Sequence, residues 1–175
     1  MMKKTLQSLL ITSALAASMS AFAVDGTVNF TGEVTAQTCR IDGATGAATK
    51  NVTLPKVSTS ALSTVGQVAG RTKITFALSQ CSEDTGVSVR FEPGPTVSAA
   101  TGNLLNQTSG GSNAQIQLLN SDFGIINAST NTGHITTNIA QGNATLTYYA
   151  QYVAATAAAT AGIVSSSVQY SLAYN

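Results

Sequence analysis

The chain has 175 residues, of which 9% are charged, and its eight basic and seven acidic residues give a formal net charge of +1. This balance provides no electrostatic attraction for nucleic acid or for an anionic membrane surface, so neither is expected as a partner. The length suits one domain of ordinary size.

The first 23 residues have the pattern of an export signal. Two lysines precede an apolar run at residues 6–17, and residues 21–23 read Ala-Phe-Ala, the small-x-small form that signal peptidase cleaves. The apolar run is short for a bilayer span, so a retained membrane anchor is the weaker alternative. The sequence therefore predicts cleavage after Ala23 and a mature chain that acts in the periplasm or beyond it.

The next stretch, VDGTVNFTGEV at residues 24–34, alternates strictly between two kinds of residue. A two-residue period predicts a β-strand with one buried face. The buried set would be Val24, Gly26, Val28, Phe30, Gly32 and Val34. Chain ends fray unless something ties them down, so this strand needs a partner. The pattern fits pairing within its own sheet and pairing with another molecule equally well.

Short β-like runs recur along the middle of the chain, separated by turn residues. They lie at residues 51–54, 73–78, 87–91, 114–118 and 146–152. Two stretches are expected to be loops: residues 96–113, which are rich in Gly, Ser, Thr and Asn, and the Ala/Thr-rich residues 154–161, which precede Gly162. Several short strands without a long amphipathic helix favour an antiparallel sandwich.

The C-terminal stretch VSSSVQYSLAYN, residues 164–175, alternates in the same way as residues 24–34. Its even positions are Val164, Ser166, Val168, Tyr170, Leu172 and Tyr174. This pattern predicts a half-buried strand that continues almost to Asn175.

Cys39 and Cys81 are the only cysteines. In an exported protein the default is a disulfide between them, and two free thiols are the alternative. Closing this loop would stabilise the fold by about 4 kcal/mol in the chain-entropy model.

The residue types that carry catalysis are scarce. His134 is the only histidine, it follows a Thr/Asn-rich stretch, and no GxSxG motif accompanies it, so we expect a solvated surface histidine. Two cysteines and one distant histidine are too few ligands for a metal centre. We therefore expect no enzymatic activity, no cofactor and no metal.

Four stretches together carry a resemblance to a known family: GTVNFTGEVTAQTCRI, KITFALSQC, LTYYAQYVA and AGIVSSSVQYSLAYN. They resemble type 1-like fimbrial subunits, the pilins of the chaperone–usher pathway. The resemblance implies an all-β fold, an incomplete immunoglobulin-like Greek-key sandwich that lacks its last strand and is completed in trans by a donor strand. It also implies three parts: a cleaved signal peptide at residues 1–23, a donor-strand extension at 24–34, and one pilin domain at 35–175.

The resemblance assigns roles to the two alternating stretches. Residues 24–34 would be the donor strand, whose Val28, Phe30 and Val34 enter the groove of a neighbouring subunit, while Gly32 permits close approach. The acceptor groove would be lined or bordered by the C-terminal strand through Val168, Tyr170, Leu172 and Tyr174. The carboxylate of Asn175 would be gripped by basic residues of a periplasmic chaperone.

The implied function is that of a structural subunit, the major one of the shaft, in an adhesive surface fimbria. The implied partners are other copies or related fimbrial subunits, a periplasmic chaperone, an outer-membrane usher and, through the fibre, a host surface receptor. A tip adhesin is disfavoured because it would add a lectin domain and lack the donor strand. The alternatives are a minor or adaptor fimbrial subunit and a closed secreted β-sandwich that binds a ligand.

Overall fold

The computed structural model describes residues 28–31, 39–44, 47–82 and 85–175. The chain divides into two compact units, Met1–Thr35 and Ala36–Asn175. In the first unit, residues 28–31 form neither helix nor strand, and the side chains of Val28 and Phe30 are 75% and 92% exposed. The predicted signal peptide and its cleavage site lie outside the described residues, as do Val24, Gly26, Gly32 and Val34.

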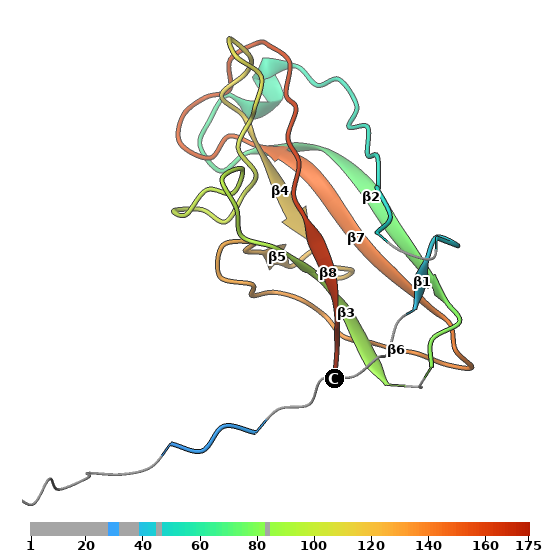
Figure 1. Cartoon of the computed structure of the whole chain (residues 1–175). Coiled ribbons are helices and arrows are strands. Elements are labelled where there is room, and N and C mark those ends of the chain that lie inside the picture. Colours follow the sequence, from blue (N-terminus) through green and yellow to red (C-terminus); the bar gives the residue numbers. More distant parts are fainter. Residues whose placement is uncertain (1–27, 32–38, 45–46, 83–84) are drawn as a thin grey trace, which may run out of the picture. The chain divides into compact units, whose positions relative to one another are not determined.

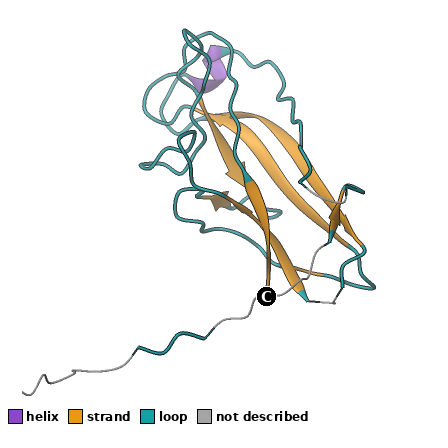
Figure 2. Cartoon of the chain, in the orientation of Figure 1, coloured by secondary structure: helices purple, strands orange, loops and turns teal. Residues whose placement is uncertain are grey.

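The second unit contains two antiparallel sheets. The five-stranded sheet has the order β1 (Arg40–Ile41), β2 (Val68–Ser79), β7 (Ala144–Val153), β4 (Gln115–Leu119) and β5 (Ile125–Ile126). The three-stranded sheet has the order β6 (Thr137–Asn138), β3 (Gly86–Phe91) and β8 (Tyr170–Tyr174). Figure 1 shows β8 lying beside β3, and β2 beside β7. One short 3-10 helix, η1 (Thr59–Leu62), is the only helix in the described ranges (Figure 2).

The core lies between the two sheets, because alternate residues of each strand point inward. Tyr148 of β7 lies at its centre, with its ring edge-on to Phe76 of β2 and to Phe91 of β3 at centroid distances of 5.9 and 5.6 Å. The Tyr148 hydroxyl accepts a hydrogen bond of 2.8 Å from the backbone N–H of Val89 on the opposite sheet. The two sheets are thus joined by packing and by one buried polar contact.

The all-β sandwich predicted from the sequence is confirmed. Four predicted strands, at residues 73–78, 87–91, 114–118 and 146–152, coincide with β2, β3, β4 and β7. Residues 96–113 and 154–161 contain no helix or strand, as expected for loops.

Two strand predictions need correction. Residues 51–54 alternate between exposed and half-buried side chains, but they pair with no strand in the described part of the chain and so form no strand themselves. The predicted C-terminal strand is shorter than residues 164–175, because regular pairing with β3 begins only at Tyr170. In both cases the side-chain alternation is present, but regular strand pairing is absent among the described residues, and residues 165–169 make only scattered hydrogen bonds.

Candidate strand-binding groove

A groove of about 740 Å³ lies between two extended segments of the second unit. We call residues 47–54 the early rim and residues 166–171 the late rim. The floor between them consists of apolar side chains from β2, β4 and β7, namely Ile74, Phe76, Ile116, Leu118 and Ala150. A groove with an apolar floor offers burial for the inward side chains of an extended strand.

The late rim is bonded to neighbouring backbone along one edge. The backbone carbonyls of Gln169 and Ser167 accept hydrogen bonds from the N–H of Glu92, at 2.8 Å, and from the hydroxyl of Thr96, at 2.6 Å. β8 continues this pairing along β3 to Asn175. The opposite edge of β8 has no strand partner among the described residues. One edge of the three-stranded sheet is therefore open, which soluble proteins normally avoid.

The early rim supplies the other wall. Val52 and Leu54 are half-buried and pack against the main core, while Asn51 and Thr53 face outward. Pro55 follows directly and has no backbone N–H to donate to a ladder. The alternation that predicted a strand at 51–54 therefore has a physical basis, since one face is buried. Among the described residues, no strand pairs with either this segment or the groove-facing edge of the late rim.

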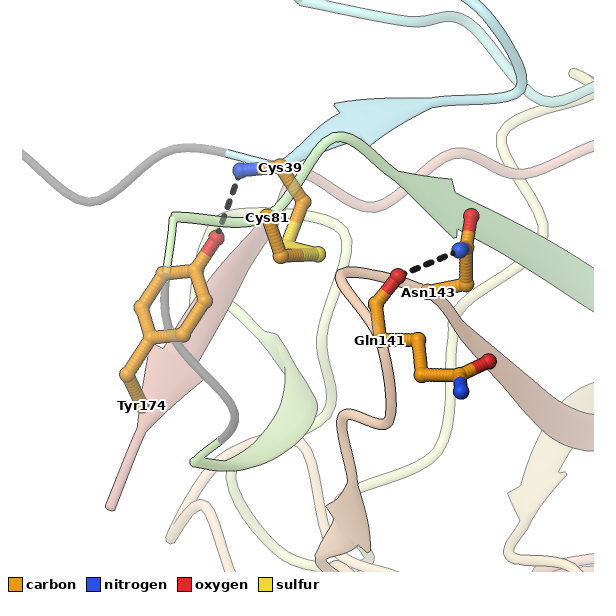
Figure 3. Close-up of a disulfide and its surroundings, with 5 residues drawn as sticks. All are labelled: Cys39, Cys81, Gln141, Asn143 and Tyr174. Carbon is orange, nitrogen blue, oxygen red and sulfur yellow. Dashed lines mark hydrogen bonds between the residues drawn. A yellow bond between two sulfur atoms is a disulfide. The ribbon is translucent and has the colours of Figure 1, made fainter.

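The predicted acceptor residues divide into two pairs. Val168 and Tyr170 line the groove, whereas Leu172 and Tyr174 are not among its lining residues and pack at the margin of the core. The Tyr174 hydroxyl accepts a hydrogen bond of 3.1 Å from the backbone N–H of Cys39 (Figure 3). Asn175 pairs its backbone with Gly86, and its side-chain amide donates to the hydroxyl of Thr136 at 3.0 Å.

Sequence reasoning missed the floor and most of the early rim. Floor residues such as Ile116 and Ala150 read as ordinary core positions, and no local pattern marks them as lining an opening. The early rim does have a recognisable sequence pattern, the alternation at residues 51–54, but that pattern predicts a paired strand and not the wall of a groove.

The predicted disulfide between Cys39 and Cys81 is present, with an S–S distance of 2.06 Å (Figure 3). It joins the residue before β1 to the second residue after the end of β2. The backbone N–H of Cys81 also donates to the carbonyl of Gly142 at 3.0 Å, in the turn before β7. The bridge therefore anchors the start of the second unit beside Tyr174 of β8.

An ion pair lies at the early rim. The Lys50 ammonium is 2.5 Å from the Asp42 carboxylate, and this hydrogen bond lowers the pKa of Asp42. The same ammonium lies 5.4 Å from the centre of the Phe76 ring, within the range of a cation–π contact. Lys50 thus covers part of the groove floor while its charge stays paired.

The expectation of a solvated His134 is wrong. Its ring stacks on Phe91 with centroids 6.3 Å apart, and neither buried ring nitrogen makes a hydrogen bond of normal geometry. Burial lowers the pKa of His134, and the positive charge of Arg90 acts in the same direction. His134 lies in a loop and stacks on Phe91 of β3, so it has a packing role.

The described residues contain neither a candidate metal site nor a candidate membrane-spanning helix. No three His, Cys, Asp or Glu side chains within them are grouped as a metal site would require. None of their helices has the length and apolar character needed to cross a membrane.

Together, the two sheets and the groove define an antiparallel β-sandwich in which the edge strand β8 borders an apolar groove. The family model for type-1 fimbrial protein A matches residues 54–175. The major fimbrial subunit SMF-1 of Stenotrophomonas maltophilia is 45% identical over 170 residues, which cover 91% of this chain and 98% of the relative. The F17 fimbrial protein of Escherichia coli is 41% identical over 175 residues, covering 92% and 93% of the two chains. The chain belongs to the type-1 fimbrial protein family.

Solved structures agree with this assignment. An antigen and type I fimbria protein of Burkholderia pseudomallei is 32% identical and superposes with a TM-score of 0.58 over 78% of this chain and 88% of that one. The P pilus rod subunit PapA, at 21% identity, has a TM-score of 0.59 over 78% of this chain and 99% of that one, which shows a shared fold. As a fimbrial subunit, the protein is a structural component of the cell surface and not an enzyme.

Proposed function

We propose that this chain is a shaft subunit of an adhesive surface fimbria that polymerises by donor-strand exchange. Residues 24–34 of one copy fill the groove of the next copy. The observation that carries this proposal is the open edge of β8 beside an apolar groove floor. A strand added at such an edge pairs its backbone with β8 and places alternate side chains on the floor, a mode of β-strand addition for which pilins are a known example.

The leading segment has the length and the pattern that this role needs. Its 11 residues would extend about 36 Å at ~3.3 Å per residue. Val28, Phe30 and Val34 would reach the floor, each contributing roughly 1.5–3 kcal/mol before ordering costs. Val28 and Phe30 are largely exposed within the first unit, so insertion into a groove would bury their apolar surface. Gly32 has no side chain and would permit close approach of the two backbones.

The proposal includes two helper proteins and a position in the fibre. A periplasmic chaperone occupies the groove before assembly and binds the carboxylate of Asn175, and an outer-membrane usher receives the complex. A solved chaperone–usher pilus structure, 20% identical with a TM-score of 0.62, has the same fold. The relative named as a major fimbrial subunit supports the major role here over that of a minor or adaptor subunit.

The experiment that tests exchange is a deletion of residues 24–34 placed after an intact signal peptide. We expect the truncated subunit to accumulate with its chaperone and to form no fibres, because it has no strand to donate. Electron microscopy of cells that express the gene with its neighbours measures this directly. Normal fibres from the truncated chain would refute donor-strand exchange.

A matched pair of substitutions tests whether the inward side chains of residues 24–34 enter the groove, or whether only the length of this segment matters. Phe30→Asp places a charge on the side that should enter the groove, whereas Thr31→Asp places it on the opposite side. We expect Phe30→Asp to abolish fibres and Thr31→Asp to leave them intact. Equal effects of the two would show that this segment does not insert with the proposed face.

A further inference from the structure

We propose that Tyr170 is a latch across the groove, which the leading segment of a second copy must open as it enters. This inference rests on the proposed function. The Tyr170 hydroxyl donates a hydrogen bond of 2.6 Å to the backbone carbonyl of Ala48. Tyr170 belongs to the late rim and Ala48 to the early rim, so this bond connects the two walls of the groove directly.

The ring of Tyr170 is held inside the groove by two contacts. One is the hydroxyl bond, and the other is a tilted stack on Phe76 with centroids 5.0 Å apart. Lys50 approaches the same Phe76 ring from the early rim and is fixed by Asp42. As a result Phe76 is only 2% exposed although it forms part of the floor. Both rims therefore contribute to covering this part of the groove.

The latch competes with an incoming strand in two ways. The hydroxyl gives the Ala48 carbonyl a hydrogen bond that the backbone of an inserted strand could otherwise supply. It also fixes the ring over Phe76, where an inward side chain of the donor would need space. A phenylalanine at this position would keep the ring and its stacking but could move aside freely. The hydroxyl of Tyr170 thus slows strand entry and holds the early rim in the unfilled subunit.

The test uses the full mature chain with its disulfide formed and a synthetic labelled peptide of residues 24–34. Every chain carries Phe30→Asp, so that only the peptide can fill the groove. Fluorescence anisotropy follows association for the chain with Tyr170, for Tyr170→Phe and for Tyr174→Phe. Tyr174→Phe is the matched control, because it loses one hydroxyl bond, to Cys39, at a residue that does not line the groove.

We expect Tyr170→Phe to bind the peptide about two- to tenfold faster, as the loss of one net hydrogen bond implies. Tyr174→Phe should bind at the rate of the chain that keeps both tyrosines. In the peptide-free state, amide hydrogen exchange in residues 47–54 should be faster in Tyr170→Phe than in the control, because the hydrogen bond from Tyr170 to Ala48 no longer holds the early rim. In the peptide-bound state this difference should disappear.

Three outcomes would overturn the latch. An unchanged or slower rate for Tyr170→Phe would show that the hydroxyl does not oppose entry. Equal exchange in residues 47–54 would show that it does not hold the early rim. If none of the chains binds the peptide, the donor-strand function fails, and the role of the latch fails with it. If the chains bind the peptide but Tyr170→Phe does not bind it faster, the latch is rejected and the donor-strand function stands.

Discussion

Three tyrosine hydroxyls each connect segments that are far apart in the sequence. Tyr148 accepts from the backbone of Val89, Tyr170 donates to Ala48, and Tyr174 accepts from Cys39. Each ring contributes apolar area to the core or its margin, while its hydroxyl satisfies a backbone group that has no ladder partner there. At the scale of single residues, these hydroxyls complete hydrogen bonding that the two small sheets leave unfinished.

Replacing Tyr148 with phenylalanine should lower the free energy of unfolding by about 1–3 kcal/mol, because the N–H of the fully buried Val89 would lose its partner. Urea denaturation measures the change. Tyr149→Phe is the control, since this half-buried neighbour packs its ring on Phe123. Tyr149→Phe also removes one hydroxyl, and it should change the free energy of unfolding by less than about 0.5 kcal/mol. Equal effects would contradict a stabilising role for the cross-sheet bond.

His134 should make stability depend on mild acid. Its folded-state pKa lies below its ordinary value, so the unfolded chain binds the proton more readily. The stabilising contribution of the neutral ring is present above the unfolded pKa of about 6.5 and is lost as the pH falls below it. The free energy of unfolding should therefore fall between pH 7 and pH 5.

The comparison for that prediction is His134→Phe, which keeps an aromatic ring against Phe91 and cannot titrate. Urea midpoints of the two chains should converge as the pH rises and separate towards pH 5. The Asp42 carboxylate does not interfere, because its lowered pKa confines its contribution to more acidic conditions. Parallel pH profiles would show that His134 is not the responsible group.

At the scale of elements, the disulfide compensates for a very short strand. β1 has only two residues, and its ladder with β2 covers only Arg40–Ser79 and Ile41–Leu78. A ladder of this length provides little stability by itself. The covalent bond between Cys39 and Cys81 holds the segment in place and, with it, the N–H that bonds to Tyr174.

Cys81→Ser should lower the free energy of unfolding by about 4 kcal/mol, given a sequence separation of 42 residues. Periplasmic yield and the urea midpoint measure the loss. The double variant Cys39→Ser/Cys81→Ser is the control for effects of an unpaired thiol, and it should match the single variant. An unchanged midpoint would mean that the bridge adds no stability.

The same scale shows where prediction from the sequence succeeds. A two-residue alternation reports which side chains are buried, and it located four strands and the half-buried faces of residues 51–54 and 164–169. It does not report whether a neighbouring backbone is present to bond with. The two segments whose strand assignment was wrong or too long form the two rims of the groove, and in the described part of the chain no strand pairs with either of them on the side that faces the groove.

At the scale of the whole molecule, the sandwich and the disulfide were predictable because they depend on local pattern and on a single possible pairing. The groove floor was not, because Ile116 and Ala150 become lining residues only when β4, β7 and both rims are in place. The burial of His134 also depends on tertiary contact, since its loop packs on β3 through Phe91.

The pairing of β3 with β8 sets the order of events during folding. It joins Gly86 to Asn175, so this sheet can form only after the whole stretch between these two residues is available to fold. Contacts of such long range make folding slow, in the range of milliseconds to seconds for β-sandwiches. Until then the apolar residues of β3 lack the partner strand that they have in the folded sheet, and an unpaired apolar strand promotes aggregation. The rate of this long-range pairing, and not only the final stability, should therefore influence the yield of folded subunit.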